Sequence, residues 1–363
     1  MKSRTITAAL CIMVLFAPAV LASDYTDSLK TGKAEIRSAG SLAFGPEAIL
    51  FIGDSMGGSI FAIDTGDRTP GSASRIDIKG INEKVSAMLG TAADQILIND
   101  MAVNPISKKI YLAVSRGRGP SAAAVILKVD ANGKIEEVSL DNIKHASVAL
   151  GNAPASGEGR AAQNRLQTIT DMAFVDGRVF VAGLSNEEFS SKLRSVEFPF
   201  GSADAGTSVE IYHGNHARLE TNSPVRTFVP YSINNRPHIL AAYTCTPLVT
   251  FPVSDLKPGQ KILGRTIAEL GNRNRPLDMI IYNKGGQDFI LMSNSSRGVM
   301  KLPATNLDGY DHIGEPVADK AGVDYETLEL TGVEQLDQLD DTHAVILSRA
   351  DGGSLDLVSI ALP

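Results

Sequence analysis

The chain has 363 residues, of which 43% are hydrophobic and 21% are charged, and its formal net charge is −7. An acidic chain without clusters of Lys and Arg argues against a protein that binds nucleic acid or an anionic membrane surface. Tryptophan is absent altogether, which disfavours carbohydrate binding by stacked indole rings.

The first 22 residues are predicted to be an export signal. Lys2 and Arg4 precede an apolar stretch from Ile6 to Leu21, and the small residue Ala22 follows it. This stretch is too short, and has the wrong flanking residues, for a helix that spans a membrane. We therefore expect cleavage after Ala22 and a periplasmic or secreted product that has no membrane span.

The rest of the chain, residues 23–363, is predicted to be one domain without a disulfide. Cys11 lies in the export signal, so Cys245 is the only cysteine of the mature chain. A single cysteine cannot form an intramolecular disulfide, although an oxidising compartment would permit one. Packing and strand pairing must therefore stabilise the fold. The formal net charge of the mature chain falls to −9 once Lys2 and Arg4 are removed.

Six pairs of apolar strands recur along the chain, with about 51 to 71 residues between equivalent positions. The first strands of the six pairs begin at Ser41, Asp100, Asp171, Thr227, Asp278 and Glu334. Repeats of this length that consist of short β-rich runs are typical of propeller blades. The sequence therefore predicts an all-β fold, a single β-propeller in which six blades are favoured over seven.

The second repeat shows how four strands would fill one blade. Its predicted strands are 100–104, 109–115, 123–129 and 135–140. Asn-Pro and Asn-Gly pairs mark the turns, because Asn and Gly accept the left-handed backbone of a tight hairpin. The last repeat has only three strands. We expect Ala34–Ser38, near the N-terminus, to supply its fourth strand and so to close the ring.

One repeat resembles known families. Residues 45–55 read Gly-Pro-Glu-Ala-Ile-Leu-Phe-Ile-Gly-Asp-Ser, and residues 58–64 read Gly-Ser-Ile-Phe-Ala-Ile-Asp. This order of turn, apolar strand, Asp, Gly-rich loop and second strand resembles the NHL and gluconolactonase-like propellers. The resemblance implies a propeller fold, and a divalent metal ion or a substrate near the central axis as in gluconolactonase-like members. The lack of tryptophan separates the chain from WD-type propellers and from the Trp-based docking motif of quinone-dependent dehydrogenases.

Four acidic residues occupy the same position, the start of the innermost strand, in four repeats. They are Asp100, Asp171, Asp278 and Glu334. Carboxylates that converge near one axis repel one another unless they bind a cation, share protons or accept hydrogen bonds. Two interpretations stay open. Each acid is a structural clasp that accepts backbone N–H bonds from the next blade, or the acids hold a cationic ligand or a metal ion, with Asp100, Asp171 and Asp278 as the metal ligands.

Four arginines lie in the loops that join the second and third strands of the blades, which are predicted to share one face. They are Arg116, Arg118, Arg297 and Arg349. An arginine can bind a carboxylate or a phosphate through two parallel hydrogen bonds. Arg116 and Arg297 are therefore predicted to contact a ligand above the acidic ring. The alternative is that the arginines neutralise this ring through ion pairs.

Two insertions on the same face are predicted to be lids or recognition segments, or else a cover over the core. The first insertion is 151–163, which is rich in Gly and Ala, and the second is 185–207. In the second, Asn186 is expected to cap a short helix that places Phe189 and Leu193 on one side.

Cys245 and three histidines raise the question of a copper or zinc site, because these metals favour thiolate and imidazole ligands. The predicted strand order argues against such a site. His213 and His216 flank a predicted turn, and His238 begins a strand about 23 Å long that ends near Cys245. All three histidines are therefore expected on the face opposite to Cys245, which is read as a buried small hydrophobic residue.

The function predicted first is binding of a small ligand or a divalent cation such as Ca²⁺ at the mouth of the central channel. The four acids would line the site and two of the arginines, Arg116 and Arg297, would lie above them. One alternative is a metal-dependent hydrolase of lactones or esters, in which the ion polarises a carbonyl and activates water. Another is a protein-interaction scaffold that uses the Phe-rich second insertion, and copper-dependent redox chemistry is a fourth. The hydrolase would need a titratable base near the ion, for which Asp171 or Glu334 is the best candidate, and enzymatic activity stays open.

Overall fold

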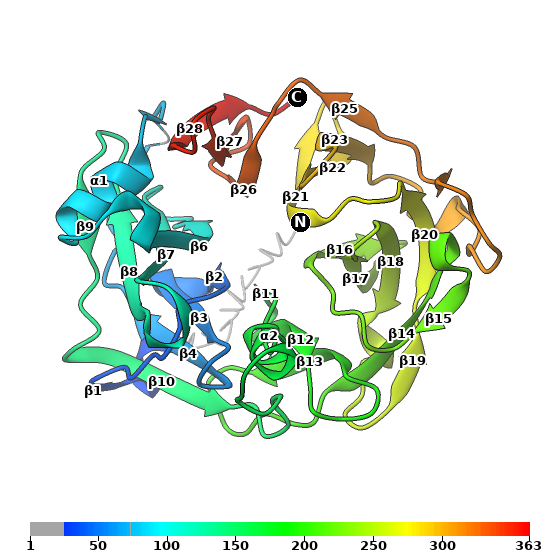
Figure 1. Cartoon of the computed structure of the whole chain (residues 1–363), viewed down its shortest axis with the longest axis horizontal. Coiled ribbons are helices and arrows are strands. Elements are labelled where there is room, and N and C mark those ends of the chain that lie inside the picture. The colour runs from blue at the N-terminus through cyan, green and yellow to red at the C-terminus, as the bar shows by residue number, and fades with distance from the viewer. Residues whose placement is uncertain (1–24, 73) are drawn as a thin grey trace, which may run out of the picture.

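The computed structural model describes residues 25–72 and 74–363, which form a β-propeller of six blades around a central axis (Figure 1). Each blade is a sheet of at least four strands. The predicted all-β architecture and the favoured number of blades are therefore confirmed. The predicted export signal lies outside the described residues, and no helix within the described part is long and apolar enough to cross a membrane.

The strands of each blade follow one another from the central axis outward, with the innermost strand first. Blade 1 has β2 (Leu42–Phe44), β3 (Ile49–Asp54), β4 (Ser59–Asp64), β10 (Ile143–Ala149) and β1 (Lys30–Gly32). Blade 2 has β6 (Ile96–Val103), β7 (Ile110–Arg116), β8 (Ala123–Val129) and β9 (Ile135–Glu137). Blade 3 has β11 (Asp171–Val175), β12 (Arg178–Leu184), β13 (Ser191–Glu197), β14 (Thr207–His213) and β15 (Arg218–Glu220).

The second half of the ring has the same plan. Blade 4 has β16 (Thr227–Ile233), β17 (Arg236–Ala242), β18 (Pro247–Pro252), β20 (Arg265–Leu270) and β24 (Lys320–Gly322). Blade 5 has β21 (Pro276–Lys284), β22 (Gln287–Asn294), β23 (Gly298–Pro303) and β25 (Glu326–Leu328). Blade 6 has β26 (Val333–Gln338), β27 (His343–Arg349), β28 (Leu355–Ala361) and β5 (Asp77–Ile78). One further strand, β19 (Lys261–Leu263), pairs in parallel with β14.

Helices are few and short in the described chain. The α-helices are α1 (Ile81–Met88) and α2 (Arg160–Leu166). The 3₁₀ turns are η1 (Tyr25–Ser28), η2 (Pro46–Ala48), η3 (Ala93–Gln95), η4 (Gly119–Ser121), η5 (Gly214–His216), η6 (Val253–Asp255) and η7 (Leu307–Gly309). Strands in the middle of a blade, such as β3, are buried on both faces because neighbouring blades pack against both sides. Such strands are continuous apolar runs in the sequence rather than alternating ones.

The blades do not follow one another around the ring in chain order. Blade 2 lies between blades 1 and 6, and blade 1 lies between blades 2 and 3 (Figure 1). After β4 the chain passes to the outer edge of blade 6 as β5, continues through α1 into blade 2, and returns to blade 1 as β10. The order around the ring is therefore 1, 3, 4, 5, 6, 2.

The strand that closes the ring is β5, and the expectation that Ala34–Ser38 would close it is wrong. β5 pairs antiparallel with β28 and completes blade 6. The backbone N–H groups of Arg37 and Ser38 instead donate to the carboxylate of Asp54, at 2.8 and 2.9 Å. This segment therefore packs on blade 1, and blade 6 takes its outer strand from β5.

Apolar side chains fill the spaces between neighbouring blades. One cluster joins blades 3, 4 and 5, and the others join blades 2 and 6, 1 and 3, 1 and 2, and 5 and 6. These pairs are all neighbours in the order of blades around the ring. Between blades 1 and 3, the ring of Phe51 stacks on Phe174 at 5.3 Å and meets Phe198 edge-on at 5.0 Å. Aromatic pairs of this geometry add to the stabilisation from burial.

The second insertion contains a strand, and the expected helix is wrong. β13 pairs with β12 along its whole length. Leu193 therefore lies in a strand and Phe189 precedes this strand, so the two residues are not on one face of a helix. Their spacing of four residues fits a helix, but pairing with a buried neighbouring strand outweighs such a local preference. Phe198, which follows β13, is buried in the cluster between blades 1 and 3. This aromatic side chain of the insertion therefore packs inside the molecule.

Candidate functional site

The innermost strands of all six blades line a cavity of about 600 Å³ on the central axis. Its wall runs from Asp100, Asp171 and Asp278 to the turns that follow β6 and β26. The wall carries one lysine, Lys108, and six aspartates. Four of the aspartates lie on the innermost strands and are called the channel aspartates: Asp100, Asp171, Asp278 and Asp337. The structure thus brings together the three aspartates that the sequence proposed as metal ligands.

Each channel aspartate fastens two neighbouring blades together. One carboxylate oxygen accepts the backbone N–H of the next residue in its own strand. The other accepts a backbone N–H from the innermost strand of the next blade, always in the same direction around the ring. The four pairs are Asp100 with Leu42, Asp171 with Phe228, Asp278 with Leu336 and Asp337 with Val103, at 2.6 to 2.8 Å. The structural clasp considered from the sequence is therefore present.

Blade 6 places Asp337 on the cavity wall, where the sequence predicted Glu334. A bulge at Glu334 in β26 corresponds to a bulge at Asn99 in β6, so Gln335 holds the position that Asp100 holds in β6. Asp337 lies two residues further along, so it points to the same side of the strand as Gln335. Glu334 instead forms an ion pair with Arg349 at 2.5 Å and is not a residue of the cavity wall.

The pKa values of all four channel aspartates are raised, so the four carboxyl groups do not ionise together readily. Burial and the charges of Asp171 and Asp337 raise the pKa of Asp100 to about 8, against the lowering effect of the N–H bonds that it accepts. Burial and the charge of Asp100 raise the pKa of Asp278 well above its usual value. Burial also raises the pKa of Asp171 and of Asp337 to about 6. A bound cation would relieve the repulsion between these carboxylates.

The two arginines predicted to contact a ligand lie outside the cavity wall. Arg116 ends β7 and is exposed, whereas Lys108 of the wall precedes the start of that strand, about 25 Å away along it. Arg297 donates to the carbonyl of Asn272 at 3.2 Å and pairs with Asp319 at 3.3 Å. These arginines therefore do not line the cavity that the channel aspartates share.

A second group of reactive side chains lies between blades 3 and 4, and the expected separation of His213 and His216 from Cys245 is wrong. One ligand atom of each of the three residues lies within 4.8 Å of the others. The third strand of blade 3 is β13, which the sequence had assigned to an insertion. β14 pairs with β13 only at its start, pairs also with β19, and lies beside β20 of the next blade. It therefore carries the two histidines to the β17–β18 loop, which holds Cys245, while His238 stays at the start of β17.

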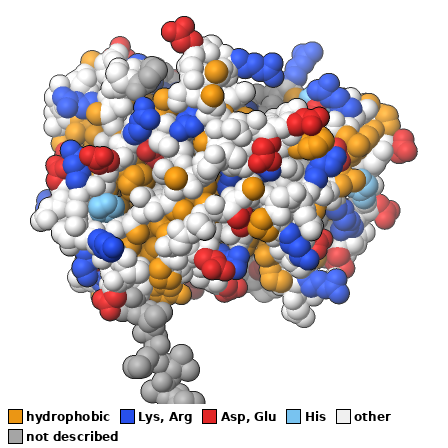
Figure 2. All heavy atoms as spheres, turned by 90° about the horizontal axis from the view of Figure 1, so that it is seen from below, with side chains coloured by type: hydrophobic (Ala, Val, Ile, Leu, Met, Phe, Trp, Pro, Cys, Tyr) orange, Lys and Arg blue, Asp and Glu red, His pale blue; other side chains and the backbone are white. Residues whose placement is uncertain are grey.

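Charged side chains of both signs are mixed over the face of the molecule that Figure 2 shows. Asp and Glu lie beside Lys and Arg across this face, with apolar side chains between them. No block of basic residues covers the described part of this face.

Comparisons with known proteins identify no family for this chain. No family model matches it, and no curated protein matches it. Solved structures match at low identity. A candidate oxidoreductase (glucose dehydrogenase) from Thermus thermophilus is 12% identical with a TM-score of 0.41, over 92% of this chain and 100% of that one.

Two further structures give similar values. The PQQ-bound form of an aldose sugar dehydrogenase from Streptomyces coelicolor is 11% identical with a TM-score of 0.35, over 91% of this chain and 96% of that one. The extracellular domain of a candidate one component system from B. thetaiotaomicron is 10% identical with a TM-score of 0.35, over 91% of this chain and 39% of that one. Similarity at this level concerns the fold alone, and no activity of this chain follows from it.

Proposed function

We propose that the protein is an exported β-propeller that binds a divalent metal ion or a small cationic ligand in its central channel. The observation that supports this most directly is the presence of four channel aspartates on one cavity wall that carries a single lysine, Lys108. A carboxylate oxygen that accepts one backbone N–H keeps a second lone pair, which can face a ligand. A cation in the cavity would also stabilise the ionised form of carboxyl groups whose pKa values are raised.

Calcium is the metal ion that suits this wall best. Ca²⁺ takes six to eight oxygen ligands at about 2.3 to 2.6 Å, and carboxylates from several strands together with water can supply them. The proposed ligands are Asp100, Asp171 and Asp278, joined by Asp337 in place of Glu334. An amine of small size would use the same carboxylates through N–H bonds.

A titration with Ca²⁺ tests the proposal. A ligand at a concentration of about 100 times its Kd stabilises the native state by about 2.7 kcal/mol, so a clear rise in Tm is expected. Asp171→Asn and Asp278→Asn should each weaken Ca²⁺ binding by about tenfold or more, because the amide keeps an acceptor oxygen but loses the charge. Isothermal titration calorimetry and thermal unfolding measure both effects.

The control for these variants is Asp255→Asn, which removes a charge from an exposed residue outside the cavity wall. It should leave Ca²⁺ binding unchanged. If Ca²⁺, Mg²⁺ and a small diamine all leave the Tm and the heat of titration of the wild type unchanged, the proposed function is wrong. An assay with lactones and aryl esters, with and without the bound cation, separates simple binding from hydrolysis.

Export rests on the N-terminal sequence, in which residues 1–22 are the proposed signal peptide and 23–363 the propeller domain. Expression in a bacterial host should give a periplasmic or secreted product. N-terminal sequencing of that product should begin at Ser23. A product that stays in the cytoplasm with its N-terminal residues intact would contradict this part of the proposal.

A further inference from the structure

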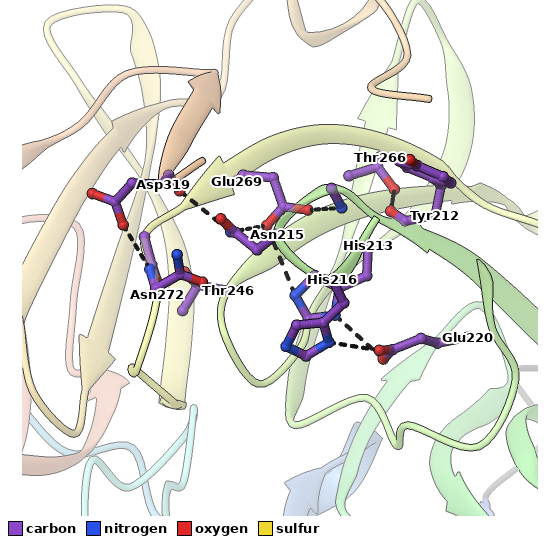
Figure 3. A network of polar contacts seen from close by, with 12 residues as sticks. Tyr212, His213, Asn215, His216, Glu220, Thr246, Thr266, Glu269, Asn272 and Asp319 are labelled. Carbon is purple, nitrogen blue, oxygen red and sulfur yellow. Dashed lines mark hydrogen bonds and ion pairs between the residues drawn. The ribbon is translucent and has the colours of Figure 1, made fainter. Parts of the chain in front are cut away.

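A cluster of metal-ligating side chains lies where blades 3 and 4 meet, at a distance in the fold from the central channel. We propose that His213, His216 and Cys245 bind one divalent transition-metal ion, Zn²⁺ or Cu²⁺, and that Glu220 orients both imidazole rings (Figure 3). None of these residues belongs to the cavity wall, so this site is independent of the function proposed above.

The buried histidine is the first reason for this inference. His213 is only 1% exposed, and neither of its ring nitrogens makes a hydrogen bond of good geometry. Buried polar atoms are almost always satisfied by a partner, so this imidazole calls for an explanation. Its Nε2 atom lies 4.0 Å from the carboxylate of Glu269, beyond hydrogen-bond distance. A metal ion is a partner that satisfies such a nitrogen.

The second reason is the carboxylate that both histidines share. Glu220 lies 2.7 Å from Nδ1 of His216 and 3.2 Å from Nδ1 of His213, and Figure 3 shows both rings turned toward it. A carboxylate on the far nitrogen of a histidine is the usual arrangement at metal sites, because it fixes the tautomer and the ring orientation. With Nδ1 of each ring turned to Glu220, the Nε2 atoms are left to bind an ion.

Glu220 is well placed for this role because its own surroundings fix its position. Its side chain is 8% exposed, and the hydroxyl of Ser223 donates a hydrogen bond to its Oε2 atom. The rings of His213 and His216 stack with their centroids 3.8 Å apart. The carboxylate and the two imidazole rings therefore form one compact group.

The third reason is the backbone that presents the thiol. Cys245 and Thr246 have φ values of 64° and 66°, in the left-handed region that a β-branched threonine rarely enters. The N–H of Cys245 donates to the carbonyl of Asn274 at 2.8 Å, and Oγ1 of Thr246 donates to the carbonyl of Gly271 at 2.9 Å. Strain that the surroundings enforce in this way is common at ligand sites. The turn holds the sulfur beside the two histidines.

The ligand set selects the class of ion. Thiolate and imidazole favour zinc and copper, whereas calcium requires oxygen ligands. The thiolate of Cys245 and the carboxylate of Glu220 together balance the charge of a divalent ion. Tetrahedral zinc sites have donor atoms about 3.5 Å apart, so the three ligand atoms need to approach by about 1 Å. The side chain of His216 is 39% exposed, which leaves a fourth position open to water.

Cobalt(II) is the spectroscopic probe for this site. The protein used should be the mature chain, residues 23–363, in which Cys245 is the only thiol, and it should be freed of metal with a chelator. One equivalent of Co²⁺ should then produce a thiolate-to-cobalt charge-transfer band and strong tetrahedral d–d bands, which Zn²⁺ removes. Cu²⁺ should give an intense thiolate-to-copper band. The relative affinities of Zn²⁺ and Cu²⁺ decide which ion the site prefers.

Substitutions connect the signal to the named residues. Cys245→Ser should abolish the charge-transfer band, and His216→Gln should weaken Co²⁺ binding by at least about tenfold. Glu220→Gln should weaken it by about 10- to 100-fold, the range found when a carboxylate partner of a ligating histidine is removed. His238→Gln, at the far end of β17, and Asp171→Asn, in the channel, should leave it unchanged.

A measurement on the protein without ligand substitutions guards against variants that fail to fold. Zn²⁺ should slow the alkylation of Cys245 by iodoacetamide at least about tenfold, and a chelator should restore the rate. If Zn²⁺ and Cu²⁺ both leave the rate unchanged, or if Co²⁺ binds His216→Gln as tightly as the wild type, the proposed site is wrong. Ca²⁺ should not compete with Co²⁺, so failure of the channel proposal would not affect this result.

Discussion

Asp54 holds in place a segment that has no strand of its own to join. Its carboxylate is 1% exposed and accepts four hydrogen bonds, from Arg37 N, Ser38 N, Ser38 Oγ and Gly57 N, at 2.8 to 2.9 Å. A carboxylate suits this task because its two oxygens accept up to four bonds. The carboxyl end of β3 thereby fixes the extended residues before β2.

Replacement of this residue should destabilise the protein strongly. Asp54→Ala leaves several buried donors without an acceptor, at about 1 to 3 kcal/mol each, so we expect a loss of at least about 3 kcal/mol in the free energy of unfolding. Asp54→Asn keeps one acceptor oxygen and should lose less. Urea unfolding measures the difference. Asp141→Ala, at a carboxylate that is 77% exposed, should change stability by no more than about 0.5 kcal/mol. Equal losses in the two alanine variants would refute this account.

The channel aspartates show what residue-level reasoning from the sequence can and cannot find. The shared strand position of Asp100, Asp171 and Asp278 predicted that they converge, and they do. Asp337 was missed because the alignment by apolar residues placed Leu336 opposite Ala102, whereas the strand pairing places Asp337 there, and a shift of one residue exchanges the two sides of a strand. The alternation of Gln335 and Asp337 on one side was the signal that could have found it.

At the scale of the element, the errors come from strands that leave their own repeat. β5 lies between blades 1 and 2 in the sequence but completes blade 6, and β14, a strand of blade 3, also runs beside β20 of blade 4. Strand propensity locates such elements, but it carries no information about their partners. The sequence did contain a signal for this exchange. The segment between β4 and β6 is longer than the fourth strand of blade 1 alone would need.

A disulfide across β5 and β28 tests this closure. Asp77 and Val358 are directly opposite in the antiparallel pair, and opposite residues have Cα atoms close enough for a disulfide. The double variant Asp77→Cys/Val358→Cys should therefore form the bond under mild oxidation, detected by peptide mapping without reduction. Because the bond closes a long loop, the Tm of the oxidised form should rise by several degrees.

In the control for this crosslink, the first cysteine lies in Ala34–Ser38, the segment that we predicted from the sequence to close the ring. Ile36→Cys with Val358→Cys should form no bond, because residue 36 packs in the cluster between blades 1 and 2. Efficient crosslinking of this pair, or none in the first, would mean that the ring closes in another way.

The order of blades is a property of the whole molecule that the repeats did not reveal. Repeat spacing and apolar runs predicted the number of blades correctly, because each blade must bury both faces against neighbours. Sequential repeats are usually adjacent in space, and this expectation fails where the chain exchanges blades 1 and 2. The hydrogen bonds of the channel aspartates nevertheless all run in the same direction around the ring. Each aspartate accepts the N–H of the blade next to it in space, whether or not that blade is next in the sequence.

The channel aspartates make the stability of the propeller depend on pH. The folded-state pKa values of Asp100, Asp171, Asp278 and Asp337 lie above the usual unfolded value of about 3.9, so the native state binds more protons than the unfolded state between about pH 4 and pH 8. Stability must therefore fall as the pH rises through this window. Glu269, whose pKa burial also raises, contributes with the same sign.

Thermal unfolding without divalent cations should show a Tm that is highest near pH 5 and lower by about 4 °C at pH 8, which corresponds to about 3 kcal/mol for a chain of this size. Asp278→Asn should flatten this dependence, because the amide cannot ionise, whereas Asp255→Asn should leave it as in the wild type. Saturating Ca²⁺ should restore the Tm at pH 8 more than at pH 5, because the cation binds the ionised carboxylates. A Tm that rises from pH 5 to pH 8 in the wild type would show that the channel aspartates are already ionised at pH 5 and that their mutual repulsion does not govern the stability of the ring.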